Sequence, residues 1–362
     1  MIEVLYSILA FLLVISIIVI THEFGHYISA KLMGVKVVDF AIGWGPKLFS
    51  IKDRSGTNWK VCAVPIGGYI KYFGDDDMTS LGTGKKKFSK AEKKIAFVTQ
   101  SLPRKAIMAA AGPLCNFLVA ILIFTYFFSV HGKLISDTVV TMVEPNSVAS
   151  KEDIKVGDKI RTIDGSNVSD FSEIERFVKA NPGIALSFGI EREGKVIKKV
   201  ITPKSEELII DDEKIQVGKL GIGSDNIKRE AYSVPKAFLV SVMETANITS
   251  FTLKTLGQIL TGHRGTKELA SVIRISKYSG KFVKQGASAF MWFIAMLSIN
   301  LGLVNLFPIP PLDGGHIFLY CVEGIASKKV YKQVETYSLK IGVAILVALM
   351  VFAIVNDIIY FK

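Results

Sequence analysis

Two histidines and a glutamate near the N-terminus are the residues best suited to chemistry. The segment Thr21-His22-Glu23-Phe24-Gly25-His26 follows an apolar run that begins at Val4. In a helix, His22 and His26 lie four positions apart, so both imidazoles project from one face and can share a metal ion. Glu23 lies beside them and can take a proton from water activated by that metal. The spacing therefore predicts metal-dependent hydrolysis.

A pattern of this length also recurs by chance, and in a soluble helix it would be weak evidence. Here it follows a run, Val4 to Ile20, that carries no charged residue. Ionisable side chains are costly at membrane depth and mark functional positions by default. We therefore favour a metal site over a chance match.

A second polar segment, Asn305 to Gly315, interrupts a later apolar span with three prolines and a single aspartate. The prolines exclude a regular helix, and non-helical backbone at membrane depth is tolerated only where it is buried in protein or lines a cavity. We expect Asp313 on an irregular turn whose flanking glycines let it approach a metal. With His22 and His26 it would hold one zinc ion per chain and leave a fourth position for water.

Asn305 is placed to donate a hydrogen bond to a substrate carbonyl or to the oxyanion that develops during attack. Pro308 and Pro310 lie on the irregular backbone that follows, and we expect them to contact the substrate. Taken alone, Asp313 would be better explained as a turn-capping residue. Its occurrence together with the histidine motif favours metal binding.

Composition places both motifs in a membrane protein. The chain has 362 residues, half of them hydrophobic, and a mean hydropathy of +0.39. Membrane spans require about 20 apolar residues. The runs of that length, or nearly so, are Val4 to Ile20 continued by the His22 helix, Ala106 to Val130, Ala287 to about Leu306, and Ile341 to Tyr360. The sequence thus predicts a polytopic α-helical membrane protein with four transmembrane helices.

The net charge of +12 is concentrated in one connection. Lys31 to Lys105 contains fifteen Lys or Arg against six Asp or Glu. Basic loops stay in the cytoplasm, which places the N-terminus and residues 132–286 outside and a short loop around Lys328 and Lys332 inside. The charge is then a signal of topology and of attraction to anionic lipid, and we expect no nucleic-acid partner.

The basic connection begins with short strands rich in aromatic and β-branched residues. Turn-forming residues, including Gly43 and Gly45, separate them. The expected strands are Val35 to Ile42, Lys47 to Lys52, Trp59 to Val64 and Tyr69 to Phe73. A small sheet dipping toward the active site could present an edge strand on which an extended substrate pairs, with Gly43 and Gly45 near it. The alternative is a hairpin cap with no substrate role, followed in either case by a basic linker.

Residues 131–225 have the order of elements of a small α+β domain without cysteines. This order resembles a PDZ domain of the bacterial, circularly permuted kind. The resemblance implies that Gly218-Lys219-Leu220-Gly221-Ile222 is a carboxylate-binding loop. Gly218, Leu220 and Gly221 would then hold the C-terminus of an exported peptide. Alternatively, the domain acts as a steric gate.

The remaining boundaries follow from these assignments. Residues 226–286 contain an amphipathic helix from Tyr232 to about Gly262 that either lies along the outer membrane surface or packs as an ordinary helix. The expected divisions are 1–34 for the first span and metal helix, 35–105 for the hairpins and basic linker, 106–130 for the second span, 287–315 for the third span with the Asn-Pro-Asp motif, 316–338 for a cytoplasmic loop and 339–362 for the fourth span.

Taken together, these motifs resemble the bacterial site-two protease family, specifically its regulator-of-sigma-E type. The resemblance covers nearly the whole chain and includes Ala111-Gly112-Pro113 at the opening of the second span. It implies that zinc is bound by His22, His26 and Asp313 and that Glu23 is the catalytic base. It departs from the best-known members in two respects: residues 131–225 have room for one PDZ domain rather than two, and the family's Ser-Gly-Pro before the third span is replaced by Ala270-Ser271-Val272.

The resemblance also implies a multi-pass protein of the bacterial inner membrane, with a periplasmic N-terminus and PDZ domain. The active site would lie toward the cytoplasm, beside a membrane-associated hairpin region. Expected substrates are single-span membrane proteins already trimmed on the periplasmic side, such as anti-sigma factors and signal-peptide remnants. The rival from another class is a membrane scaffold or peptide receptor, with a PDZ domain and a metal site that is only structural.

Overall fold

The structure is a computed structural model that describes residues 2–75, 88–210, 213–262 and 271–360. Its four long apolar helices are α1 (Ile2–Leu32), α3 (Leu102–Val130), α8 (Ala287–Asn305) and α10 (Lys328–Tyr360). Each is long and apolar enough to cross a membrane. The prediction of four helices of membrane-spanning length and composition is therefore confirmed within the described residues.

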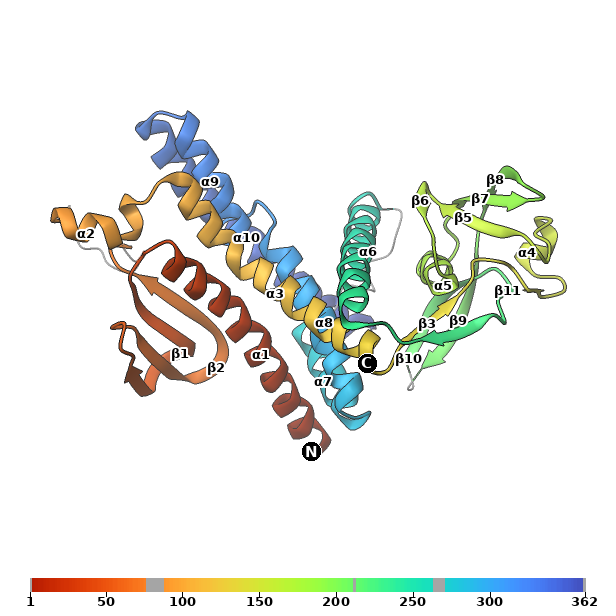
Figure 1. The fold of residues 1–362 in the computed structure, drawn as a ribbon, viewed down its shortest axis with the longest axis horizontal. Coiled ribbons are helices and arrows are strands. Elements are labelled where there is room, and N and C mark those ends of the chain that lie inside the picture. The colour runs from red at the N-terminus through yellow and green to blue at the C-terminus, as the bar shows by residue number, and fades with distance from the viewer. Residues whose placement is uncertain (1, 76–87, 211–212, 263–270, 361–362) are drawn as a thin grey trace.

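The helical part separates two β-rich regions (Figure 1). At one end lie β1 (Val37–Lys52) and β2 (Asn58–Tyr72), with the short helices α2 (Lys90–Ile95) and η1 (Phe97–Thr99) close by. At the other end, a mixed α/β unit formed by residues 133–230 projects away from the helices. We call this unit the globular domain.

The helices pack through aromatic and small side chains. Phe124 and Phe128 of α3 are buried in one cluster with Ala295 and Ile299 of α8. A second cluster joins α1 to α8 through residues such as Val14. Burial of side chains of this size contributes about 1.5–3 kcal/mol each in a water-soluble core, but in a lipid bilayer the gain comes mainly from close packing. The clusters fix α1, α3 and α8 as one unit.

β1 and β2 are each bent into two halves, and the two halves of a strand pair with different sets of residues. Residues 39–42 of β1 lie opposite both 58–61 and 68–71 of β2, whereas residues 47–52 lie opposite 58–62. The four short strands expected from the sequence are therefore present as halves of two long, irregular strands. The half formed by residues 68–72 pairs on one side only among the described residues, so it is an edge.

The globular domain has a four-stranded antiparallel sheet in the order β6-β5-β7-β8, covered by α5. Ile160, Phe188 and Ile201 lie fully buried beneath it. A hairpin of β9 and β10 was not foreseen from the sequence. The elements are β3 (Lys133–Ser136), β4 (Met142–Val143), α4 (Val148–Lys151), β5 (Lys159–Ile163), β6 (Ser166–Asn167), α5 (Phe171–Lys179), β7 (Leu186–Arg192), β8 (Lys195–Ile201), β9 (Lys204–Ile210), β10 (Glu213–Lys219), β11 (Ile222–Gly223) and β12 (Ile227–Glu230).

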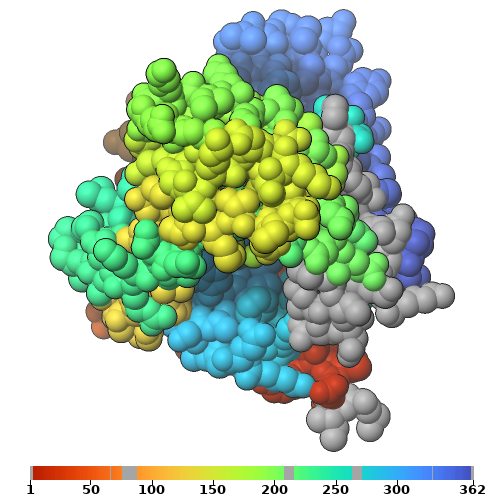
Figure 2. Space-filling view, turned by 90° about the vertical axis from the view of Figure 1, so that its right-hand side faces the viewer, coloured from red at the N-terminus to blue at the C-terminus, as the bar shows by residue number. Residues whose placement is uncertain are grey.

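The helix α6 (Val234–Leu260) joins the globular domain to the helical part. It packs on α3 and α8 through Ala237 and Ile248, so the packed-helix alternative describes it better than a helix lying free on a membrane surface. Figure 2 shows the globular domain, in yellow and green, covering much of this end of the helical part, with light-blue residues visible beneath it. A further helix, α7 (Val272–Lys284), was not predicted.

The structure corrects several expected boundaries. The second span begins at Leu102, so Ala111-Gly112-Pro113 lies inside α3 rather than at its opening. The loop expected at residues 316–338 is instead occupied by α9 (Asp313–Ile325) and the first turns of α10. Asp313 is the first residue of α9 rather than part of an irregular turn. The basic linker falls partly on residues 76–87, which lie outside the described residues.

Candidate metal centre

Three side chains from α1 and α9 converge at the predicted metal site. The Nε2 atoms of His22 and His26 are 3.3 Å apart. They lie 3.1 Å and 3.4 Å from the two carboxylate oxygens of Asp313. One ligand atom from each residue fits within 4.8 Å of the others. Residues almost three hundred positions apart thus share one small site, as the sequence predicted.

The far nitrogen of each histidine ring is held by α3. His26 Nδ1 donates to the carbonyl oxygen of Met108 at 2.8 Å, which leaves its Nε2 lone pair directed at the site. The side-chain amide of Asn116 lies between His22 Nδ1 and the Thr21 hydroxyl, 3.3 Å from each. When His22 binds a metal through Nε2, Nδ1 carries the proton, so the amide must present its oxygen to the ring and its nitrogen to the Thr21 hydroxyl. Asn116 therefore bonds across the helix contact.

Gly112 of α3 lets the two helices approach closely enough for this contact. A Cβ atom at Gly112 would lie 2.3 Å from His26 Nε2 and 2.9 Å from His22 Cε1. Next to His26, a Cβ at Gly25 of α1 would lie 2.3 Å from the carbonyl oxygen of Ala111. The floor of the site is thus backbone, and a side chain there would occupy the position of the metal ligands.

The donor set fits a zinc ion. Two imidazole nitrogens and one carboxylate are the ligands of many catalytic zinc sites, which keep a fourth position open. The two histidines are buried, each with its second nitrogen occupied, and the three acceptors point at a common centre. Without a cation, three such acceptors would repel one another at these distances. The arrangement therefore suits a divalent cation better than a purely structural hydrogen-bond cluster.

The three residues open into a cavity of about 770 Å³. Glu23 and Asn305, the expected base and hydrogen-bond donor, both line it. The edge half of β2 contributes Gly68, Tyr69 and Ile70 to the same wall. A base, a donor and an edge strand thus face one space beside the three metal-ligand candidates.

Several residues predicted to bind substrate lie elsewhere. Gly43 and Gly45 form the bend of β1, where both have positive φ, and neither lines the cavity. Pro308 and Pro310 also lie outside its lining, which includes the neighbouring Pro311 and Leu312 instead. The turn residues thus shape the backbone, while the adjacent strand and the end of the proline segment face the cavity.

The three residues proposed to hold a peptide C-terminus lie together on the globular domain. Gly218, Leu220 and Gly221 line a separate groove of about 300 Å³. Phe171, Ile174 and Val178 of α5 form its opposite wall. Gly218 belongs to β10 rather than to a loop, and a Cβ there would lie 2.0 Å from the carbonyl oxygen of Val178. The groove is therefore narrow at that point.

Sequence reasoning missed the polar residues at the other end of the metal cavity. They come from α3, α9 and α10 and comprise Lys105, Tyr320, Glu323, Tyr331 and Glu335. Lys105 is buried, lies 4.0 Å from the Glu323 carboxylate and is close to the Phe97 and Tyr320 rings. Lysines are rarely buried without a role, but nothing in the sequence distinguishes Lys105 from the fourteen other basic residues of its connection.

Comparison with known proteins supports the identification of the site. The model of Peptidase family M50 matches residues 10–349. A Rhizobium meliloti protein named as a candidate zinc metalloprotease is 36% identical over 360 residues, covering 98% of this chain and 96% of its own. A similarly named Rickettsia conorii protein is 36% identical over 357 residues, covering 97% and 98%. Metalloprotease MmpA of Caulobacter vibrioides is 29% identical over 383 residues, covering 99% and 96%. The chain therefore belongs to peptidase family M50, the site-two proteases, and is a membrane zinc metalloprotease.

Proposed function

We propose that this protease cleaves the membrane-spanning segments of single-span proteins. The observation that supports this most directly is that His22, His26 and Asp313 converge beside Glu23 in one cavity between spanning helices. A hydrolytic site at the end of an apolar helix has little purpose for soluble substrates. Zinc bound by the three ligands would polarise the scissile carbonyl and make water acidic enough to lose a proton near neutral pH.

In this mechanism Glu23 accepts the proton from the attacking water and later delivers it to the leaving amine. Asn305 donates a hydrogen bond to the carbonyl oxygen as negative charge develops there. Asn116 and the Met108 carbonyl hold the two imidazole rings so that their Nε2 atoms stay directed at the centre. Each role uses a side chain or backbone atom that already faces the site.

The edge half of β2 supplies a way to present an unwound substrate. Residues 68–70 line the cavity, and their strand half pairs with β1 on one side only among the described residues. An extended peptide can add to such an edge through main-chain hydrogen bonds. This would hold a helix, once unwound, with its backbone alongside Glu23 and the metal ligands. A Cβ at Gly68 would lie 3.0 Å from the Glu23 side chain, so the approach is close.

The topology belongs to the same proposal. The described part of the basic connection, residues 31–75 and 88–105, lies with β1 and β2 at the end of the helices opposite the globular domain. By the distribution of positive charge, that end is cytoplasmic, and the N-terminus and globular domain are periplasmic in the bacterial inner membrane. The active site would then act toward the cytoplasmic side, on anti-sigma factors or signal-peptide remnants already trimmed in the periplasm.

The globular domain is proposed to be a single PDZ domain, corresponding to residues 131–225. Its groove between α5 and β10 has an apolar wall of Ile174 and Val178 and includes the expected carboxylate-loop residues Leu220 and Gly221. A free peptide C-terminus, exposed when the periplasmic part of a substrate has been removed, is the ligand that such a groove suits. The steric-gate alternative requires only the domain's bulk near the helices.

The decisive experiment substitutes Glu23 by Gln in the full-length purified chain. The variant is expected to keep about one zinc per chain while cleavage of truncated single-span substrates falls by at least ~100-fold, since the base is lost. Retained cleavage would refute the role of Glu23. Loss of zinc together with activity would instead show that Glu23 supports the ligands rather than the chemistry.

A second candidate function is a membrane peptide receptor with a structural metal, which the groove on the globular domain favours. Chelation separates the two. A catalytic zinc site should lose proteolysis on chelation while the helices stay folded, whereas a structural site should unfold with its metal. A receptor should also bind peptide C-termini equally well with Glu or Gln at position 23.

A further inference from the structure

The last helix, α10, contacts the rest of the chain at few points. Among its residues whose side chains the structure describes, only Gly342, Asn356 and Asp357 are buried. Asp357 binds the α7 terminus, where the backbone N–H of Ser271 donates to it at 2.9 Å and Arg274 pairs with it. Gly342 is therefore the one buried residue in the middle of the helix among those described. The residue that it contacts, Pro310, lies close to the metal-ligand candidate Asp313.

At Gly342 the backbone of α10 rests directly on the proline segment. A Cβ atom there would lie 1.5 Å from the carbonyl oxygen of Pro310 and 2.6 Å from its carbonyl carbon. This is closer than for any other described glycine. Backbone atoms cannot rotate away as the end of a flexible side chain can, so any side chain at position 342 must displace α10 or Pro310.

Pro310 also packs closely against α9, the helix that carries Asp313. A Cβ at Gly315 of α9 would lie 2.3 Å from the Pro310 nitrogen. Pro310 is buried and lies three positions before Asp313, the first residue of α9. A displacement of Pro310 is thus passed on to the start of α9 within one helical turn, and with it to the carboxylate that faces His22 and His26.

Gly342 also shares a helix face with residues of the metal cavity. Three residues of α10 line that cavity: Tyr331, Glu335 and Leu339. Together with Gly342 they form a series in which successive residues are four, four and three positions apart. Side chains at such intervals project from one face. The contact with Pro310 therefore continues the wall that α10 contributes to the cavity, although Gly342 itself contributes no side chain to it.

We propose that Gly342 is a positioning residue for the metal ligand Asp313. Its missing side chain lets α10 hold Pro310 against Gly315, and this fixes the segment from which the Asp313 carboxylate reaches the ion. The proposal rests on the metal-binding role of Asp313 proposed above. It assigns to α10, which supplies no metal ligand, a part in setting the geometry of the centre.

The test compares Gly342→Ala with Gly257→Ala in the full-length protein. Gly257 is also a helical glycine, but a Cβ there would meet nothing within 4 Å. Gly342→Ala is expected to weaken zinc binding by about 10–100-fold, the usual effect of losing support behind a metal ligand. Its cobalt-substituted form should show a changed absorption spectrum, and kcat should fall more than KM rises. Gly257→Ala should match the parent in all three measurements.

Folding of the helical part is followed separately by far-ultraviolet circular dichroism of the full-length chain in detergent. A folded Gly342→Ala chain with the zinc affinity and cobalt spectrum of Gly257→Ala would overturn the proposal while leaving the proposed function intact. A parent chain that binds no zinc would instead refute the metal role of Asp313 itself.

A second variant serves if Gly342→Ala does not fold. Leu346 lies one turn beyond Gly342 on the same face and is half-buried, so Leu346→Ala loosens the contact without crowding it. Faster zinc release to a chelator than in Gly257→Ala is the expected result. Unchanged release would show that the seating of α10 does not affect the metal centre, and the proposal would fail.

Discussion

The metal centre and the junction between α6 and the globular domain are assembled by opposite means. At the centre, backbone packs against ligand side chains, and position 112 has no room even for a methyl group. At the junction, charged and amide side chains meet in pairs. A catalytic constellation must be held within about 0.5 Å, whereas a domain outside that centre can be attached by contacts that water is able to replace. The difference suggests a rigid reaction centre with a releasable domain.

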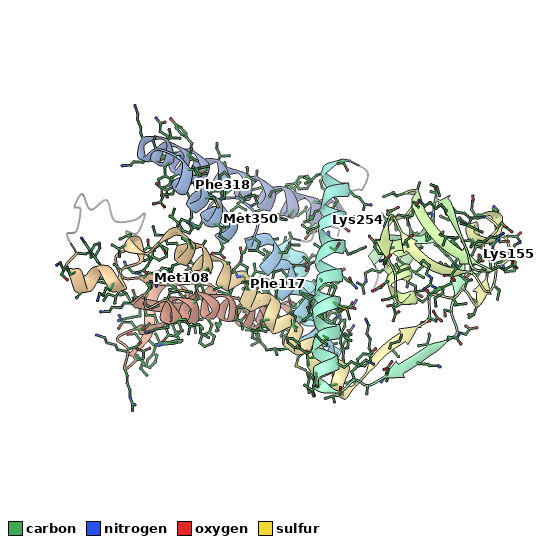
Figure 3. All side chains as sticks on the ribbon, turned by 45° about the horizontal axis from the view of Figure 1, so that its top comes forward. Met108, Phe117, Lys155, Lys254, Phe318 and Met350 are labelled. Carbon is green, nitrogen blue, oxygen red and sulfur yellow. The ribbon has the colours of Figure 1, made fainter. Side chains whose placement is uncertain are left out.

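The junction follows one stripe of α6, at positions 244, 247, 251, 254 and 258. Glu244 accepts from Lys133 at 2.8 Å and from Arg176 at 3.0 Å. Further along the stripe, Asn247 donates to Glu173, Lys254 pairs with Asp164, and Gln258 donates to Asn181. Figure 3 shows Lys254 on the side of α6 that faces the domain. Phe251 meets Phe177 edge to face, and the Lys254 ammonium lies over the same Phe177 ring.

The largest effect is expected at the centre, from Gly112→Ala. The added methyl would lie 2.3 Å from His26 Nε2, so α1 and α3 must separate and the rings must turn. We expect zinc affinity to fall by ~100-fold and cleavage to be lost, because ligand support of this kind is worth up to that factor. Zinc content and cleavage of a model substrate measure this. An active, zinc-loaded variant would show that the centre tolerates expansion. The metal centre would then be no more rigid than the junction between α6 and the globular domain.

The second prediction asks whether the globular domain is independent of the centre. Arg192 holds the buried Asp158 with two hydrogen bonds, of 2.6 Å and 2.8 Å. Arg192→Met would leave that carboxylate buried without its partner and should destabilise the domain by about 3 kcal/mol. Pulse proteolysis of the full-length chain reports the loss. Arg161→Met is the control, since the Arg161–Glu191 pair is solvent-exposed and should cost under ~1 kcal/mol. Zinc content should stay unchanged in both.

The local parts of this architecture could be predicted from the sequence. Helical spacing alone was enough to predict that His22 and His26 share a site. Asp313 could be predicted because a metal site needs a carboxylate and the proline-broken span supplies one. The parts that depend on tertiary approach could not be predicted. Nothing near Gly112 or Gly342 in the sequence reveals which backbone comes to rest on it, and Asn116 has equally good partners within its own helix. The start of α10 was missed because residues 328–338 are too polar to resemble a membrane span.

The third prediction concerns the junction itself, through Glu244→Gln. Burial raises the pKa of Glu244, but Lys133 and Arg176 outweigh it, so the pKa lies below its ordinary value. The group therefore stabilises docking above an ordinary pKa of 4.5, and the effect is lost as pH falls through the lower docked value. Glu244→Gln should cost about 2 kcal/mol of docking at neutral pH. Spin labels at the exposed Val196 and Leu239 would show a broader distance distribution.

In the parent, the same broadening should appear on acidification below about pH 4.5, and the variant should lack that pH dependence. A variant with the parent's narrow distribution at neutral pH would mean that apolar contacts hold the domain. In that case the junction and the centre would differ less than their contacts indicate.

The smallest effect is expected from a substitution in an ion pair that does not cross the junction, compared with one in a pair that does. Helix α5 carries both kinds: Arg176 reaches Glu244 on α6, whereas Lys179 pairs with Glu175 one turn away on its own helix. Both residues of the second pair are more than half exposed, so Lys179→Gln should change stability by only ~0.3–0.5 kcal/mol and leave the label distances as they are. Arg176→Gln removes one of the two partners of a buried carboxylate and should broaden them. Equal effects of the two substitutions would mean that the net charge of α5, rather than contact across the stripe, holds the domain in place.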